Sequence, residues 1–470
     1  MEVNLSAALE TLTPSQYITF TIPSPIKHRH LSSFHTPLLH VAVLDSPTLS
    51  DTLPPLIAAM IVPNHRETDW NFCTKSGHLQ LLSSNVSRLI LIGNHFDNNI
   101  SYYNNDKNEY CVYIRPPVID ALDKEKLESE LKDLVIALHP KLCFQNGVPK
   151  NVLFLSYEDD VLCSVIVGRF VGRFVGEFVV EDVQVEVKDG TEKEFRRRLR
   201  FKRMPNLIQS QVRLVCGKGD VAGDIGRLDL GRLREMKEVE FRVDTGILVH
   251  AYLNPMVCGL FLIVVPLNER IERGLTPRAL CLGVGGGALL SFLNAQLGFE
   301  VVGVEADEVV LSVARKYFGL KDGQFIRIIV GDAIKLIENV GSLGTSEDIL
   351  NGKFDVVMVD LDSSKAVYGL SAPPPEFVKK CVLQAMRRVL HDHGVLVINV
   401  IPRDKLFYET LIQELRDVFH KVYEIDVDND GSFVLMATLS PITSIDNDNA
   451  FLKRLRSVIS GSYMDSIVEL

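Results

Sequence analysis

Closely spaced glycines in one segment of the sequence could hold an adenosine-containing cofactor. The segment LCLGVGGGALLSFL, Leu280 to Leu293, enters a glycine cluster from one hydrophobic run and leaves it by another. This pattern is typical of a strand that passes through a tight loop into a helix, with the backbone bare enough to approach a ligand. Gly283, Gly285 and Ala288 fit the dinucleotide pattern G-x-G-x-x-G/A. Gly283, Gly285 and Gly287 fit the G-x-G-x-G of S-adenosylmethionine enzymes equally well, so the loop alone leaves both cofactors open.

An acid follows the glycine cluster at a useful distance. Glu305 ends the hydrophobic run EVVGVEAD and stands 18 residues after Gly287. A carboxylate at this position can accept hydrogen bonds from both ribose hydroxyls, and it would repel a 2′-phosphate, which disfavours NADP. The structural alternative is an acidic helix start, because Asp307 can cap the helix predicted to follow.

Polar residues also follow the next predicted strands. Strand FIRIIVGDA ends in Asp332 and Ala333, where methyltransferases can bind the adenine amino group and a ring nitrogen. Strand FDVVMVDLD is almost wholly hydrophobic and ends in Asp360 and Asp362. Ligands bind beyond the carboxyl ends of parallel strands, so these acids are functional candidates. A fifth strand, GVLVINVIPRD, carries two more candidates near its end, Asn399 and Arg403.

The end of this strand and helix alternation distinguishes the two cofactors. The segment HKVYEIDVDNDGSFVLMATL, His420 to Leu439, predicts two strands around Asn429-Asp430-Gly431, a hairpin signal. A parallel sheet that finishes with a hairpin contains an antiparallel strand. We therefore predict an α/β fold, a seven-stranded Rossmann-like S-adenosylmethionine methyltransferase domain, with the glycine loop facing the methionine part of the cofactor.

Composition limits the class of protein. The chain has 470 residues, enough for two or three domains, and 46% of them are hydrophobic. A net charge of −10 argues against a nucleic-acid binder that works by bulk charge. The eight cysteines form no C-x-x-C pair, so we expect neither a disulfide framework nor a zinc site, and a cytoplasmic location. We expect no secretory signal and no membrane span, because the most hydrophobic stretch, Val257 to Leu267, is far short of roughly 20 residues and predicts a buried helix.

The region before this alternation predicts a separate α+β domain. Three hydrophobic runs between about Leu38 and Ile92 predict strands, and Asp120 to Pro140 predicts an amphipathic helix. The tetrads VGRFVGRFVGEF, Val167 to Phe178, predict a locally duplicated, twisted strand with glycines at bends. The expected parts are an N-terminal α+β domain at 1–215, a linker at 216–245, the methyltransferase domain at 246–440 and a C-terminal helical tail at 441–470.

A basic stretch allows two interpretations. The segment EFRRRLRFKRM, Glu194 to Met204, predicts the solvated face of a strand whose alternate residues Leu199 and Phe201 point inward. The alternative is a docking site for an acidic partner such as RNA. The acidic chain and the lack of interleaved aromatic residues disfavour it, so no direct nucleic-acid partner is expected.

Four segments resemble the C-terminal half of the methyltransferase-like protein 13 family: LCLGVGGGALLSFL, GVEADEVVLSVARKYFGL, FDVVMVDLDSSKAVYGLSAPPPEF and VINVIPRD. These are the elongation factor 1-alpha lysine and N-terminal methyltransferases, and the chain looks like a plant-type relative. The resemblance covers most of residues 40–440. It implies S-adenosylmethionine as cofactor, a spermidine-synthase-like fold, and methylation of the N-terminal α-amine of elongation factor 1-alpha. Only one glycine loop with a following acid occurs here, so the family's lysine-modifying half is not expected.

The resemblance also implies roles for the site residues. We expect Asp360 to orient the substrate amine, and Asp362 to support the loop or the substrate. The segment SAPPPEF, Ser371 to Phe377, would form a stiff wall of a peptide channel, or else a rigid start to the following helix. Catalytic residues are expected at Asp360 and Asp362, cofactor-binding residues at Gly283, Gly285, Gly287, Glu305, Asp332, Ala333 and Asp360, substrate-binding residues at Asn399, Arg403 and Tyr252, and no metal ligands.

Two other functions remain open at this level. A polyamine aminopropyltransferase would share the fold, but spermidine synthases carry an Asp where Ala288 stands and a D-x-S-D-P-like motif where DLDSSK stands. A binding protein that has lost the chemistry is the other alternative. The retained glycines and acids of the predicted site disfavour it.

Overall fold

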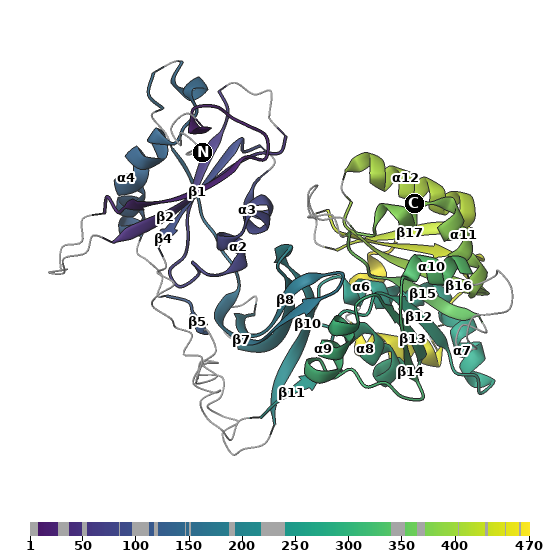
Figure 1. The fold of residues 1–470 in the computed structure, drawn as a ribbon. Coiled ribbons are helices and arrows are strands. Elements are labelled where there is room, and N and C mark those ends of the chain that lie inside the picture. Colours follow the sequence, from purple (N-terminus) through teal and green to yellow (C-terminus); the bar gives the residue numbers. More distant parts are fainter. Residues whose placement is uncertain are drawn as a thin grey trace.

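The strands of the computed structural model form three sheets, which Figure 1 shows from purple through teal to yellow along the chain. The structure describes residues 8–26, 37–48, 54–83, 85–95, 112–116, 121–145, 147–149, 152–187, 193–217, 240–339, 353–363, 372–402, 404–427, 431–446, 448–459 and 462–470.

The first sheet lies in the N-terminal part and has five strands in the order β1-β2-β4-β3-β6. Strands β1, β2 and β4 pair antiparallel, whereas β4, β3 and β6 pair parallel. Helix α4 covers one face and two short helices lie near the other, as the amphipathic pattern of 120–140 predicted. The elements are β1 Tyr17–Pro23, β2 Leu38–Asp45, β3 Ile57–Ile61, α2 Trp70–Cys73, α3 Lys75–Leu81, β4 Arg88–Asn94, α4 Ala121–Ala137, η1 Lys141–Phe144 and β6 Leu153–Leu155.

The second sheet is antiparallel, in the order β11-β10-β9-β8-β7-β5. The tetrad repeat forms the turn end of the hairpin between β7 and β8, with a register shift before Gly168 and the turn after Gly172. The linker expected at 216–245 includes strand residues at both ends, because β10 continues to Gly217 and β11 pairs with it; residues 218–239 lie outside the described part. The strands are β5 Val112–Ile114, β7 Val161–Gly172, β8 Gly176–Glu186, β9 Lys193–Phe201, β10 Met204–Gly217 and β11 Glu240–Asp244.

The arginines of the basic stretch form ion pairs within the protein. Arg197 contacts Asp182, and Arg200 contacts both Asp69 and Glu181. Leu199 and Phe201 point inward as predicted. The expected solvated face is wrong, because the neighbouring strand β8 and the residue that caps helix α2 supply carboxylates that neutralise the arginines. The same pairing leaves little free charge for an acidic partner.

The third sheet is the predicted α/β domain, in the order β14-β13-β12-β15-β16-β18-β17-β19. Strands β14 to β16 in this order pair parallel and β18 is antiparallel to both neighbours, which is the predicted seven-stranded arrangement with its final hairpin. The two-residue strand β19 adds an eighth strand beyond β17. The strands are β12 Arg278–Leu282, β13 Glu300–Glu305, β14 Ile326–Val330, β15 Phe354–Val359, β16 Leu390–Val400, β17 Lys421–Asp426, β18 Phe433–Thr438 and β19 Val468–Glu469.

Helices cover both faces of this sheet, as Figure 1 shows. The hydrophobic segment Leu253–Glu272 is long and apolar enough by composition to span a membrane, but its buried residues pack into the core of the sheet, as predicted for a buried helix. The predicted tail also packs onto the domain and ends in a strand. The helices are α6 Leu253–Cys258, η3 Gly259–Ile263, α7 Val264–Glu272, α8 Ala288–Leu297, α9 Glu308–Tyr317, α10 Ala333–Asn339, η6 Pro375–Val378, α11 Lys380–Val389, α12 Lys405–Val418, α13 Ala450–Val458 and α14 Ser462–Asp465.

The second sheet packs against the third beside helix α9. Phe178 and Phe201 of the second sheet share a hydrophobic cluster with Val310 of helix α9 and with Phe318, which follows that helix. At the tip of the β7–β8 hairpin, the backbone N–H groups of residues 174 and 175 donate to Asp307 Oδ2 at 2.8 and 3.3 Å. Asp307 is buried and also caps α9, so one carboxylate holds both elements.

Candidate functional site

The glycine loop joins β12 to α8 and brings its backbone against the end of β15. Gly283, Gly285 and Gly287 have φ values of +93°, +52° and +79°, the region that favours glycine. A Cβ on Gly283 would lie 2.0 Å from the carbonyl oxygen of Asp360. Gly283 and Gly285 line a cavity at the carboxyl ends of the strands, whereas Gly287 packs against Leu320.

Glu305 ends β13 and faces the glycine loop. Its Oε2 accepts the backbone N–H groups of Val284 and Gly285 at 3.3 and 3.2 Å, and its Oε1 accepts that of Asp307 at 3.0 Å. Burial raises the pKa of Glu305, and these hydrogen bonds oppose the rise. The carboxylate is therefore fixed in the cavity wall, where it can accept hydroxyl hydrogens.

The acid after β14 occupies a different position. Asp332 is exposed and caps α10, accepting the backbone N–H groups of residues 334 and 335 at 3.0 and 3.2 Å. Ala333 is the first residue of that helix and is buried in the core of the domain. Neither residue lines the cavity that contains Gly283 and Glu305, so their adenine-binding role stays a prediction.

Three polar side chains converge between β15, β16 and the segment before α6. Tyr252 donates to Asp360 Oδ2 at 3.1 Å, and Asn399 Nδ2 donates to Asp360 Oδ1 at 3.1 Å. Burial raises the pKa of Asp360 to about 6, although both hydrogen bonds oppose the rise. Burial and the nearby Asp360 raise the pKa of Tyr252 well above its usual range. The buried Oδ1 of Asn399 has no hydrogen-bond partner, so the cluster offers an open acceptor.

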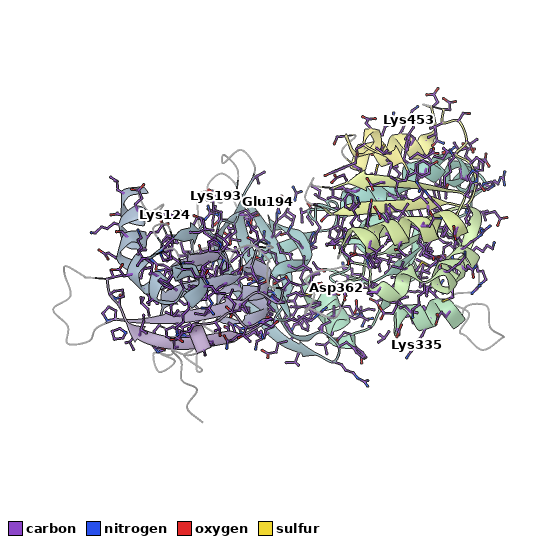
Figure 2. The ribbon with its side chains drawn as sticks, turned by 90° about the horizontal axis from the view of Figure 1, so that it is seen from above. Lys124, Lys193, Glu194, Lys335, Asp362 and Lys453 are labelled. Atoms are coloured by element: carbon purple, nitrogen blue, oxygen red, sulfur yellow. The ribbon has the colours of Figure 1, made fainter. Side chains whose placement is uncertain are left out.

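Asp362 points to the second sheet. Its carboxylate pairs with Arg203, with Nη2 2.9 Å from Oδ2 and 3.1 Å from Oδ1. Figure 2 labels Asp362 where the second sheet meets the C-terminal domain. Burial raises the pKa of Asp362, and the Arg203 charge opposes the rise. The structure thus brings Asp360, Asn399 and Tyr252 together and gives Asp362 a separate partner.

One wall of the cavity comes from strand β10, which the sequence analysis did not include in the site. Leu207 to Gln211 line it, and Ser210 Oγ accepts the backbone N–H of Gly286 at 2.7 Å. His250 also lines it and its Nε2 lies 2.9 Å from the Ile208 carbonyl oxygen, while burial lowers its pKa to about 4. Three consecutive polar residues in QSQ, within an otherwise alternating strand, were the available sequence signal.

Some predicted site residues fall elsewhere. Arg403 and Ser371 lie outside the described residues. Within the SAPPPEF segment, Ala372 lines the cavity, and Pro375 begins the 3-10 helix η6 rather than α11. Among the described residues there is no group of three or more His, Cys, Asp or Glu that could hold a metal ion.

Comparison with known proteins gives matches of two kinds, and no family model matches the chain. The eEF1A lysine and N-terminal methyltransferase of Xenopus laevis is 28% identical over 405 residues, which cover 84% of this chain and 52% of that protein. The polyamine aminopropyltransferase of Vibrio vulnificus (strain CMCP6) is 28% identical over 187 residues, which cover 39% of this chain and 56% of that enzyme.

Among solved structures, human methyltransferase-like protein 13 in complex with SAH matches 46% of this chain and 93% of that chain, with 24% identity and a TM-score of 0.39. The chain spans about half the length of the curated methyltransferases that it matches. Over most of its own length, the chain is thus similar to the eEF1A lysine and N-terminal methyltransferases, as its sequence motifs predicted.

Proposed function

We propose that this chain is an S-adenosylmethionine-dependent protein methyltransferase whose substrate is the N-terminal α-amine of translation elongation factor 1-alpha. The cluster of Asp360, Tyr252 and Asn399 beside the glycine loop carries this proposal. It offers a carboxylate and an open acceptor to an amine. The similarity to the eEF1A methyltransferases supports both the cofactor and the substrate.

The residues of the cavity fit this cofactor. Gly283 and Gly285 leave backbone free of side chains, and Glu305 presents a fixed carboxylate suited to the ribose hydroxyls. These three residues line the same cavity as Asp360. When bound, S-adenosylmethionine supplies an electrophilic methyl group, which leaves the sulfur as a new N–C bond forms. The remaining tasks belong to the protein, which must orient the amine and accept its proton.

Asp360 is suited to those tasks. With a pKa of about 6 it is mostly ionised at pH 7, so it can accept a hydrogen bond from the amine and hold the released proton. Tyr252 and Asn399 fix the orientation of its carboxylate, and the open Asn399 Oδ1 can accept a second amine hydrogen. An amine with two oriented N–H groups directs its lone pair to one side.

An α-amine needs little base catalysis. Its pKa is near ~8, against about 10.4 for lysine, so deprotonation at pH 7 costs about 1.4 kcal/mol for the α-amine and about 4.6 kcal/mol for lysine. A single carboxylate with a pKa of about 6 matches the first cost better than the second. We also propose a cytoplasmic location, since Cys73 and Cys381 are exposed free thiols, which suit a reducing compartment.

The test is calorimetric titration of the purified chain with S-adenosylmethionine, followed by transfer of a radiolabelled methyl group. Glu305→Ala should weaken cofactor binding about tenfold to a hundredfold, because it removes hydrogen bonds to a charged group. Glu308→Ala, an exposed position on the same segment, is the matched control and should bind like wild type.

A peptide from the N-terminus of elongation factor 1-alpha should accept the label, and the same peptide with an acetylated α-amine should not. Equal labelling of both peptides would move the site to a lysine side chain. Absence of cofactor binding by wild type would favour a binding protein on a methyltransferase fold.

Aminopropyl transfer is the second candidate, and the match to the Vibrio vulnificus enzyme favours it. It would also use an amine nucleophile, so Asp360 would serve in the same way. Decarboxylated S-adenosylmethionine with putrescine separates the two functions. Formation of spermidine, with no methyl transfer to the peptide, would replace the proposed function by this one.

A further inference from the structure

Arg203 lies in the turn between β9 and β10, yet its side chain contacts the C-terminal domain. A charged side chain in a two-residue turn normally extends into water. The side chain of Arg203 is only 19% exposed, and it reaches a residue 159 positions further along the sequence. Its neighbour in the turn, Lys202, behaves as expected and pairs with Glu177 at the surface.

The guanidinium group of Arg203 is held by several groups. Nη2 contacts both carboxylate oxygens of Asp362, and Nη1 donates to the backbone carbonyl of Ser363 at 3.1 Å. The ring of Phe201 lies 4.9 Å from the guanidinium carbon. Packing and three hydrogen-bond acceptor atoms therefore fix the position of the charge relative to the cavity.

The cavity beside this ion pair is rich in acids. Glu305, Asp360 and Asp362 line it, and no Lys or Arg is among the described residues that do so. Among the described residues, other titratable groups near the two aspartates are Tyr252 before α6 and Cys281 of β12. In addition to the effect of burial, both aspartates raise the pKa of Tyr252, and Asp360 raises the pKa of Cys281. An unpaired Asp362 would add a second negative charge two residues from Asp360.

We propose that Arg203 is a positioning residue of the transfer site: it holds Asp362 in an ion pair and so leaves Asp360 as the aspartate that receives the amine. This inference rests on the proposed function and deepens it. The second sheet then contributes to the chemistry as well as to the cavity wall. It also assigns Asp362 to charge balance between the domains and not to the reaction itself.

The activity test uses Arg203→Met, which keeps most of the side-chain length and removes the charge. Loss of the cation leaves Asp362 unpaired, and its charge raises the pKa of Asp360. The lower break in the pH profile of kcat/KM should therefore move upward by roughly one unit or more. Arg203→Lys should retain part of the wild-type profile, and Lys202→Met, in the same turn, should retain all of it.

The double variant Arg203→Met with Asp362→Asn removes the unpaired charge. It should return the break toward its wild-type pH, even if the rate stays low. A wild-type profile in Arg203→Met, or a shifted break that the second substitution does not reverse, would overturn the proposal.

A stability measurement tests the role of Arg203 and does not require enzymatic activity. In Arg203→Met the folded state raises the pKa of Asp362 further above its unfolded value than in wild type, so the denaturation midpoint should fall more steeply than that of wild type as the pH rises from 5 to 8. The double variant should lack this additional fall. If wild type transfers no methyl group, the proposed function fails while this comparison still tests the ion pair. Equal pH dependence of the two variants would refute the inference.

Discussion

At the scale of single residues, the site depends on how Asp360 is buried. The two hydrogen bonds from Tyr252 and Asn399 stabilise its ionised form, but burial outweighs them and the pKa rises to about 6. A carboxylate in water would be too acidic to hold a proton taken from an amine. Placed at the end of a buried parallel strand, the same group has a pKa close to the working pH.

Asp360→Asn should remove most of the activity and leave the fold intact. The amide cannot accept the proton, so methyl transfer should fall about 10² to 10⁴-fold at pH 7. The cofactor affinity should change much less, which calorimetric titration would show. Asp392→Asn is the control, because the Asp392 side chain is 89% exposed and does not line the cavity. A transfer rate within a few fold of wild type would exclude Asp360 as the base.

The same substitution changes the pH dependence of stability. The raised pKa means that the folded state binds the Asp360 proton more tightly than the unfolded state, so its contribution is present at low pH and is lost as the pH rises toward and through 6. Wild type should therefore lose about 1 kcal/mol of unfolding free energy between pH 5 and 7 that Asp360→Asn does not lose. Urea denaturation at both pH values measures this difference.

At the scale of elements, the cavity lies where the glycine loop, the carboxyl ends of neighbouring strands and strand β10 of the second sheet meet. The glycine loop passes close to the end of β15, and β10 of the second sheet supplies the hydroxyl that accepts the Gly286 N–H. Because β10 belongs to the second sheet, the glycine loop is held in part by a strand outside the Rossmann-like fold.

Gly283→Ala tests the close approach of loop and strand. The new Cβ would lie 2.0 Å from the Asp360 carbonyl oxygen at a φ of +93°, so the loop must move. We expect a stability loss of about 2 to 4 kcal/mol, together with loss of cofactor binding. Gly274→Ala is the matched control, since Gly274 has a φ of +74° with no atom within 4 Å. It should cost only about 1 to 2 kcal/mol and leave cofactor binding unchanged. Equal effects of the two would show that the contact is unimportant.

At the scale of the whole molecule, the second sheet and the C-terminal domain form one unit around the cavity. The contacts that join them include the Arg203–Asp362 ion pair, the Ser210 hydrogen bond, and the hairpin tip on Asp307. The elements involved are those that form the cavity or flank it. Strand β10, which the sequence analysis assigned mostly to the N-terminal domain, therefore forms part of the cavity wall.

Asp307→Ala should loosen this unit. It removes the cap of α9 and leaves the two hairpin N–H groups without their acceptor, so we expect a loss of about 2 to 4 kcal/mol of stability. Asp332→Ala removes a cap alone and should cost about 1 kcal/mol. Thermal and urea denaturation of the two variants compare the costs. A cost for Asp307→Ala no greater than that for Asp332→Ala would mean that the hairpin contact contributes nothing.

The sequence by itself determined the parts of this protein whose signals are local. Hydrophobic runs, glycines and the Asn-Asp-Gly turn predicted the C-terminal strands and their final hairpin. Because the carboxyl ends of parallel strands meet at one edge, that pattern also placed Glu305, Asp360 and Asn399 near one another. The amphipathic spacing of residues 120–140 predicted helix α4, because its hydrophobic positions repeat along one face.

Only the tertiary structure decided what depends on contacts between distant segments. Arg203 and Asp362 lie far apart in the chain, and nothing in the local pattern of a basic strand distinguishes a solvated arginine from one paired across domains. The hydrogen bond from the Gly286 N–H to Ser210 also joins segments far apart in the chain. For Asp332, an acid directly after a strand predicts a helix cap and an adenine-binding residue equally well, and the structure shows the cap. Periodicity records which face of an element is buried, whereas the partner on that face is set by how whole sheets pack.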